Sequence, residues 1–239
     1  SNSIYAAQGL PSEEELKLLE PFRAQLPPEV FTQPPIPPST ESPASLRDNM
    51  RQAQDLLAQA GWTIKEGALV NDKGERFQFE ILLTGGSFER VIAPYAANLG
   101  KLGITVNYRS IDPALYADRV KNVEYDMVVT TYGQSQSPGN EQRDYWTSAS
   151  ADRKGSRNIV GIKNAAVDAL VDAIIYADNQ QALTTACRAL DRVLWHGYYL
   201  VPNWYLANHR LAYAAKLKHP KTLPLYYSYD QWLDTWWSE

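Results

Sequence analysis

An alternation of strand and helix patterns between residues 77 and 132 constrains the fold of this chain more than any other feature. Strand patterns occupy 77–83, 104–111 and 127–132, and helix patterns occupy 87–99 and 112–122. Asp112 and Pro113 supply a cap and a first helical residue for the second helix. Connections of this length favour parallel strands joined by right-handed crossovers. The sequence therefore predicts an α/β fold with a mixed, largely parallel sheet flanked by helices.

The loop that follows the third strand carries the candidate binding residues. The apolar run breaks at Gly133, and Ser137 and Pro138 predict the cap and first residue of the next helix. Ligands of open α/β sheets bind where loops leave the carboxyl ends of strands, and a helix start adds unpaired N–H groups. Amides, hydroxyls and charges there favour holding a polar ligand over cleaving one. The candidate ligand-binding residues are Tyr132, Gln134, Ser135, Gln136, Ser137, Glu141, Arg143, Asp144 and, from a later segment, Trp204.

The region before residue 45 is rich in proline. Nine of the fifteen prolines fall between Pro11 and Pro43, after a short helix near 12–19 that Ser12 and Glu15 cap. Paired prolines exclude a regular helix and favour extended backbone. Such a segment is either a flexible linker or a strap fixed to a domain surface, and we favour the strap. Its expected anchors are Phe22, Leu26, Val30, Phe31 and Ile36. We therefore divide the chain into a strap segment, 1–44, and an α/β ligand-binding lobe, 45–239.

A helix and a hairpin are expected just before the central strands. Ser45 and Asp48 cap the helix, and Gly61 ends it. Its expected buried stripe is Leu46, Met50, Ala53, Leu57 and Ala60. The turn 71–74 predicts a hairpin between 68–70 and the first strand of the sheet.

The carboxyl-terminal part begins with a small, polar segment, 148–162, which we expect to be a surface loop. Two helices with apolar faces follow as an antiparallel pair, the first capped by Asn164 and the second ending near His196. The next apolar run, 199–207, predicts an edge strand because it contains a proline, with 211–215 as its hairpin partner.

Aromatic residues concentrate towards the end of the chain. Twelve of the twenty-seven lie from Trp195 onward. On a strand, Trp204 and Tyr205 would face opposite sides, so that one of them can line a cleft. Aromatic walls bind varied ligands through contact area and adaptable hydrogen bonds. We interpret three tryptophans of the tail as a closing core layer: Trp232, Trp236 and Trp237.

Several classes of function lack support in the sequence. A net charge of −4 gives no footprint for nucleic acid, and no apolar run reaches the ~20 residues of a membrane span. His196, His209 and His219 lack metal-ligand spacing, so we expect no metal and no cofactor. His196 ends a helix, where a cation is favourable. Cys187 fits a packed core thiol, and no nucleophile elbow occurs.

Long sequence runs resemble a known family. SPGNEQRDYW, GSRNIVGIKNAAVDALVDAI and RALDRVLWHGYYLVPNWY are similar to the carboxyl-terminal half of family 5 extracellular solute-binding proteins. These are the periplasmic oligopeptide, dipeptide and nickel receptors of bacterial ABC importers. GLPSEEELKLLEPFRAQLPPEVF and GITVNYRSIDPALYADRV resemble the same region. Among the branches, the oligopeptide receptors tied to peptide-antibiotic uptake are the best match.

The resemblance implies one lobe of a two-lobed, monomeric periplasmic receptor without catalytic activity. A first lobe and a signal peptide, both absent from this chain, would precede it, and the lobes would close about a peptide or peptide-like solute for delivery to permease subunits. With only one wall of the cleft, we expect weak or undetectable peptide binding. The amino terminus has no signal sequence, which does not exclude export.

One departure from the family concerns recognition of an amino group. Oligopeptide receptors carry an aspartate in the loop after the equivalent strand, and the matching position here is about Gln134, which has no charge. Either Glu141 or Asp144 would substitute for it, or backbone contacts would hold the ligand. Arg143 is a candidate carboxylate clamp. Two other classes stay open: a stand-alone interaction module that uses the aromatic tail, and a small α/β hydrolase that would need Ser135 beside His196 or His209.

Overall fold

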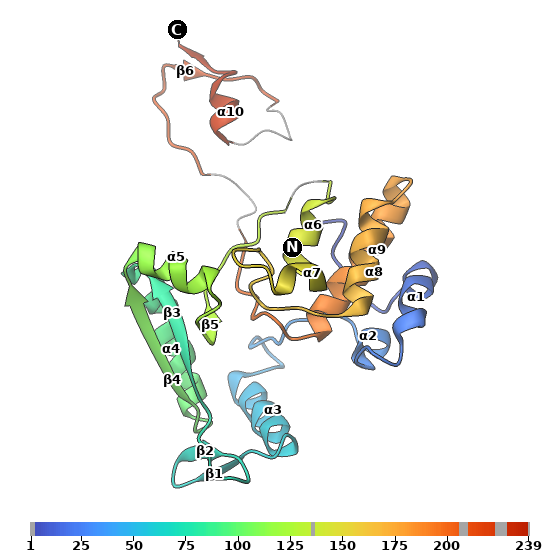
Figure 1. Ribbon diagram of the computed structural model, residues 1–239. Helices are drawn as coiled ribbons and strands as arrows, with labels where there is room; N and C mark the ends of the chain where they lie inside the picture. The colour runs from blue at the N-terminus through green and yellow to red at the C-terminus, as the bar shows by residue number, and fades with distance from the viewer. Residues whose placement is uncertain (1–2, 135–136, 206–209, 223–228, 239) are drawn as a thin grey trace.

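The computed structural model describes residues 3–134, 137–205, 210–222 and 229–238. Its elements form three groups that lie apart in Figure 1. We call them the helical unit (3–33 and 139–198), the sheet unit (46–132) and the tail (210–222 and 229–238). The helices are α1 (Glu13–Leu19), η1 (Glu20–Phe22), α2 (Glu29–Thr32), α3 (Leu46–Gln59), η2 (Gly86–Phe88), α4 (Glu89–Gly100), α5 (Pro113–Lys121), α6 (Glu141–Trp146), α7 (Ser148–Ala151), α8 (Ala165–Ile175), α9 (Gln180–His196) and α10 (Tyr229–Leu233). The strands are β1 (Thr63–Lys65), β2 (Ala68–Val70), β3 (Gln78–Thr84), β4 (Thr105–Ile111), β5 (Met127–Val128), β6 (Leu217–Lys218) and β7 (Trp237–Ser238).

A parallel sheet in the order β4-β3-β5 forms the centre of the sheet unit and confirms the predicted α/β fold. β3 pairs with β4 over seven residues, but with β5 only through Ile81 opposite Met127 and Leu82 opposite Val128. β4 and β5 lie on opposite sides of β3, so right-handed crossovers place α4 and α5 on opposite faces. The third strand is therefore shorter than expected. Val129 already leaves the ladder, and its carbonyl accepts a hydrogen bond from the Tyr116 hydroxyl at 2.9 Å.

The region before the sheet differs from the expectation in one element and in two positions of the expected buried stripe. The turn at 71–74 forms, with an isolated bridge between Val70 and Arg76, but β2 also pairs with β1, a strand that was not predicted. The Ser45 hydroxyl caps α3 by accepting the Asp48 N–H at 3.2 Å, as expected. Met50, Ala53 and Leu57 of α3 pack on the cluster of Leu69, Leu102 and Ile104. Leu46 and Ala60 are exposed, because this thin cluster does not reach either end of the helix.

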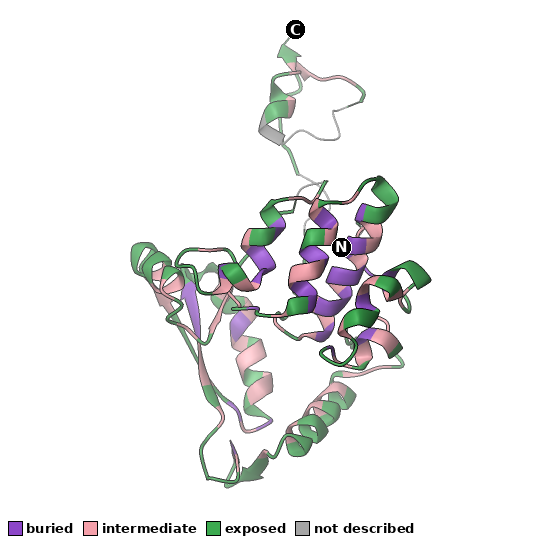
Figure 2. Cartoon of the chain, turned by 45° about the vertical axis from the view of Figure 1, so that its right-hand side comes forward, coloured by how far each residue is buried: buried purple, intermediate pink, exposed green. Residues whose placement is uncertain are grey.

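The main core lies in the helical unit, between α8 and α9 and beneath α1 and α2. Figure 2 shows that buried residues concentrate on these helices. The expected cap Asn164 accepts N–H groups of α8, and Asn179, which was not predicted as a cap, accepts the Ala182 N–H at the start of α9. Cys187 is part of this core, and burial raises the pKa of its thiol to about 12, in agreement with an inert core thiol.

Part of the expected strap belongs to this core. Leu26 and Val30 are buried in it, and Phe22 and Phe31 pack against it, whereas Ile36 is 70% exposed and is not an anchor. Proline pairs hold the backbone extended after α2, so this side chain points away from the core. The division of the chain at residue 44 stays a prediction.

A buried ion pair fixes the amino-terminal segment to α9. The Arg192 guanidinium donates to the Glu15 carboxylate at 3.0 and 3.1 Å, and it also donates to the carbonyl of Gly9 at 2.8 Å. Both side chains of the pair are almost fully buried. The Ala7 N–H donates to the Asp191 carboxylate at 2.8 Å. These contacts extend the helical core towards the start of the chain.

Two further expectations for the helical unit are wrong. His196 does not act as a cation at a helix end: it is buried, and desolvation is the main cause that lowers its pKa, so the neutral form is favoured. The segment 148–162 is not simply a surface loop. Asn158 and Ile162 are buried, because the Asn158 amide hydrogen-bonds to the Thr147 and Ile162 backbone and draws the loop inwards.

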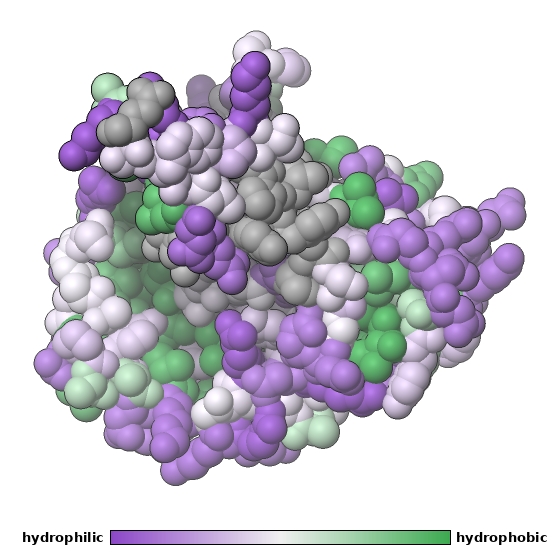
Figure 3. Space-filling view, turned by 90° about the horizontal axis from the view of Figure 1, so that it is seen from above, coloured by the Kyte–Doolittle hydropathy of each residue, from purple (hydrophilic) through white to green (hydrophobic). Residues whose placement is uncertain are grey.

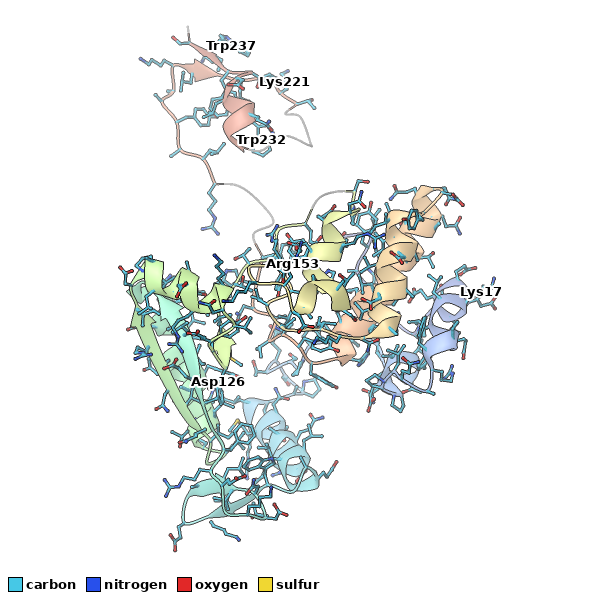
Figure 4. All side chains as sticks on the ribbon, viewed as in Figure 1. Lys17, Asp126, Arg153, Lys221, Trp232 and Trp237 are labelled. Carbon is cyan, nitrogen blue, oxygen red and sulfur yellow. The ribbon has the colours of Figure 1, made fainter. Side chains whose placement is uncertain are left out.

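The chain after α9 does not form the predicted hairpin. The described part of 199–207 contains no strand, 211–215 contains none either, and β6 instead pairs with β7. The tail tryptophans do not form a core layer. Trp237 is 52% exposed, and the Trp236 ring contacts Tyr213 within the tail, with centroids 4.6 Å apart. Figure 4 shows Trp232 and Trp237 in the tail, away from both units, so neither unit offers a surface to close over them.

Candidate functional site

A cavity of about 500 Å³ lies where the chain leaves β5, at the border between the sheet unit and the helical unit. We call it the aromatic cavity. It is lined by Phe88, Tyr116, Val120, Val128, Val129, Thr130, Thr131, Tyr132, Tyr145, Ser156, Arg157 and Ile159. This is the position, outside the carboxyl end of a parallel strand, where open α/β sheets bind ligands. Seen from above, the surface has a hollow in which hydrophobic residues gather (Figure 3).

Stacked aromatic rings build one wall of this cavity. The Tyr132 ring stacks on Trp146 of α6 with centroids 4.9 Å apart, and it also contacts Tyr145 at 5.6 Å. The Tyr145 hydroxyl donates to the Gly133 carbonyl at 2.7 Å and so ties α6 to the loop after β5. Burial raises the pKa of Tyr132 to about 12, so its phenol stays neutral at physiological pH. This wall is rigid and mainly apolar.

Trp204 reaches the other side of the site from the segment after α9. Its ring stacks on Phe88, which lines the cavity, with centroids 5.6 Å apart and planes 13° from parallel. Trp204 remains 62% exposed, so most of its surface is available for a further contact. The predicted strand is absent here, but the predicted tryptophan lies next to the cavity.

Arg157 is the one charged residue that lines the aromatic cavity. Its guanidinium carbon lies 4.3 Å from the centre of the Tyr145 ring, a cation–π arrangement that holds the group against the wall. Among the described residues it forms no ion pair, and no Asp or Glu lines the cavity. The cavity therefore combines apolar surface with a single positive charge.

The polar loop is partly held by α6. The Gln134 side-chain oxygen accepts from the Gln142 amide at 2.6 Å, and the Gln142 oxygen accepts from the Trp146 indole at 2.9 Å. Gln142 is buried, so this chain of hydrogen bonds fixes the position of Gln134. Ser137 is exposed, and Ser135 and Gln136 lie outside the described residues.

The predicted start of the next helix is wrong. α6 begins at Glu141, and neither Ser137 nor Pro138 caps it. The Gly139 N–H donates to the Glu141 carboxylate at 2.9 Å. The backbone before residue 141 thus uses a side-chain acceptor and remains outside the helix.

Arg143 and Asp144 lie at a different cavity, of about 730 Å³, which we call the charged cavity. It is lined by Asn140, Arg143, Asp144, Thr147, Ala149, Ser150, Arg153, Asp168 and Asp172. Each arginine here has an acidic partner: Arg143 pairs with Asp172 at 2.8 Å, and Arg153 pairs with Asp144. Figure 4 shows Arg153 between the two units. The structure therefore separates these two predicted residues from Tyr132 and Trp204.

Sequence reasoning missed several residues that line the aromatic cavity: Phe88, Tyr116, Tyr145 and Arg157. Phe88 follows the carboxyl end of β3, so the rule applied to the third strand also identifies this position. Arg157 lay in the segment expected to be a surface loop, and no spacing marked it. Within the described ranges, no cluster of metal-ligating side chains occurs and no helix is long and apolar enough for a membrane span.

Comparison with known proteins gives consistent results. Residues 23–154 match the family described as bacterial extracellular solute-binding proteins, family 5 Middle. An uncharacterized protein of Sinorhizobium fredii, y4wM, is 43% identical over 98% of this chain and 35% of its own length. A probable peptide-binding protein of Agrobacterium fabrum, YejA, is 41% identical over 99% of this chain and 38% of its own length. The chain thus spans a little over a third of the length of these relatives.

Solved structures share the fold. The oligopeptide-binding protein AppA of Bacillus subtilis, in complex with a nonapeptide, has a TM-score of 0.57 at 19% identity, over 78% of this chain and 38% of AppA. A periplasmic oligopeptide-binding protein of Thermotoga maritima, bound to mannohexaose, has a TM-score of 0.58 at 20% identity, over 66% of this chain and 31% of that chain.

Proposed function

The chain belongs to the bacterial extracellular solute-binding proteins of family 5, and from this premise we propose that it is one lobe of a peptide receptor for an ABC importer. The observation that carries the proposal is the aromatic cavity at the carboxyl end of β5. It offers a rigid apolar wall and a polar edge, and the described residues that line it include no catalytic set. A peptide or peptide-like solute has both apolar side chains and a polar backbone, which suits such a surface.

The proposal assigns roles to the predicted residues. Tyr132 and Trp204 would supply apolar walls. Gln134, Ser135, Gln136 and Ser137 would supply polar contacts, and Glu141 would be a partner for a ligand amine. The ion pairs of Arg143 and Asp144 with other residues of the chain give less support to their roles as carboxylate clamp and amine partner.

One lobe provides one wall of a cleft, so we expect the chain alone to bind peptides weakly, near the millimolar range. The other wall would come from a first lobe, which closes over the ligand. The share of the relatives' length that this chain spans supports this arrangement.

A chimera tests the proposal. This chain replaces its matching segment in the Agrobacterium fabrum relative, whose remaining sequence then supplies the other wall. Mass spectrometry identifies the small molecules that co-purify with the chimera and, as a control, with the intact relative. We expect peptides from both proteins. Peptides from the intact relative alone, with a folded chimera, would refute a peptide-binding role for this chain.

The proposal also covers location and partners. We propose a monomeric receptor in the periplasm that delivers its ligand to membrane permease subunits and catalyses no reaction.

The hydrolase alternative depends on Ser135 and His209, both outside the described residues, or on His196, which is buried in the helical core. Burial deprives His196 of the access to substrate that a general base needs.

The exposed aromatic residues of the tail favour a second candidate, a module that recruits a protein partner. Trp237 is 52% exposed and Tyr213 is 49% exposed. If the tail binds a second copy, sedimentation will show dimers that form with rising concentration and disappear in Trp237→Ser. A monomer at all concentrations excludes self-association through the tail.

A further inference from the structure

We propose that the aromatic cavity selects a ligand carboxylate that lies next to an apolar side chain, and that Arg157 is the residue that determines this specificity. The inference rests on the proposed function, because it names the chemical class of ligand for the same cavity. It concerns a residue that the sequence analysis did not single out.

The balance of charge in the cavity is the first argument. Arg157 brings one positive charge, and no acidic side chain among the lining residues neutralises it. Tyr116 and Tyr132 add no negative charge, because burial raises the pKa of both. An amine entering this cavity would meet a like charge and no counter-ion. A carboxylate would instead meet the positive charge of Arg157, for which the lining residues provide no acidic partner.

The geometry of Arg157 is the second argument. Its guanidinium lies against the face of Tyr145, and Tyr145 is itself fixed by its hydrogen bond to Gly133. Stacking on the ring occupies one face of the guanidinium and leaves its edge N–H groups able to bind both oxygens of a carboxylate. An arginine held in this way loses little side-chain freedom when the ligand binds.

The arginines of the charged cavity provide the contrast. Arg143 and Arg153 already have acidic partners in the chain, at Asp172 and Asp144. A ligand carboxylate would have to displace those partners, so the charged cavity offers no net attraction for an anion. Arg157 requires no such displacement.

The test uses a matched set of short peptides with the isolated chain. N-acetyl-Ala-Phe with a free carboxylate, the same peptide as its amide, and N-acetyl-Glu-Phe-amide are titrated to millimolar concentration and followed by NMR. We expect the free acid to bind about 10-fold more tightly than the amide, as one charge-assisted contact gives. The Glu peptide distinguishes a side-chain carboxylate from a terminal one. If it binds more tightly than the Ala-Phe amide, the specificity extends to acidic side chains. If the two bind equally, the specificity is restricted to the terminal carboxylate.

Two variants separate a specificity role from a structural one. Arg157→Gln should bring the affinity for the free acid down to that for the amide, whereas Arg153→Gln should preserve the difference. Because the contact is electrostatic and partly exposed, raising NaCl from 50 to 500 mM should reduce the difference in the unmodified chain. Equal affinity for acid and amide in the unmodified chain would overturn the role of Arg157 while the peptide-binding function stands. No spectral change with any of the three peptides would also overturn the role of Arg157, whereas the peptide-binding function is decided separately by the chimera, in which both walls of the cleft are present.

Discussion

The helical unit and the sheet unit bury their apolar residues in very different ways. The helical unit has one continuous core of seventeen buried residues, drawn from α1, α2, α6, α8 and α9 and the segments between them. The sheet unit has two small clusters, each with three buried residues, which are joined only through the partly buried Phe79 and Val106. Because burial of apolar surface is the main source of stability, the helical unit is the more stable of the two.

The difference explains where the aromatic cavity lies. Tyr132 packs against the helical core although it follows a strand of the sheet unit. The Tyr125 hydroxyl donates to the Ile159 carbonyl at 2.6 Å and joins the two units at the same border. A ligand at this border contacts a rigid wall on the helical side and a less firmly packed wall on the sheet side.

Loss of the buried ion pair should lower the stability of the helical unit, and it is the change with the largest expected effect. Glu15→Ala leaves the Arg192 guanidinium buried without its acidic partner, which destabilises a protein by about 3–5 kcal/mol. Urea denaturation followed by circular dichroism measures the change. The matched control is Glu20→Ala, which removes an exposed pair with Arg23 and should leave the midpoint unchanged. Equal midpoints for both variants would show that the helical core does not depend on this pair.

Truncation of one core residue in each unit gives the next largest effect. Leu170→Ala opens a cavity in the continuous helical core and should cost about 3–4 kcal/mol. Ile104→Ala affects a cluster of three buried residues that can collapse around the gap, so about 2 kcal/mol is expected. The free energy of unfolding in urea compares the two variants. A larger cost for Ile104→Ala would reverse our order of the units.

Acid should weaken the helical unit through His196. Its pKa is lowered in the folded chain, so below the unfolded value of about 6.5 the unfolded state binds more protons. Stability is therefore fully present above this pH and falls as the pH is lowered, by at most about 1.4 kcal/mol per pH unit. Melting temperatures between pH 7.5 and 5.5 measure the loss.

His196→Leu should flatten this pH dependence. The matched control is His219→Gln in the tail, where the ring contacts Tyr213 and the Pro220 carbonyl, and it should keep the dependence of the unmodified chain. An unchanged slope in His196→Leu would assign the acid sensitivity to other groups.

Removal of an exposed ion pair should give the smallest change in stability. This change should be similar in the two units. Arg153→Gln removes the pair with Asp144 in the helical unit, and Arg109→Gln removes the pair with Glu80 in the sheet unit. Each should change stability by about 0.5 kcal/mol or less, because exposed pairs are well solvated. Urea midpoints test this. A large effect in one unit alone would mean that surface charge, and not the buried core, distinguishes the units.

The sequence by itself determined the elements with strong local signals. The caps Ser12, Ser45, Asp112 and Asn164 all accept backbone N–H groups where the patterns predicted helix starts. The parallel direction of the central strands followed from the lengths of their connections. These features depend on neighbours within a few residues, so local propensity and periodicity were enough to find them.

Only the tertiary structure decided which charged side chains have an ion-pair partner and which apolar elements pack into a core. Arg143 and Arg157 look alike in the sequence, but Asp172 of another helix neutralises the first, while the second lies over a stacked ring and forms no ion pair among the described residues. In the same way, the tail tryptophans had the composition of a core layer but lie away from both units, whereas Trp204 of the apolar run after α9 stacks on Phe88 of the sheet unit. A side chain's charge balance and burial depend on partners far away in the chain, and a local pattern carries no record of those partners.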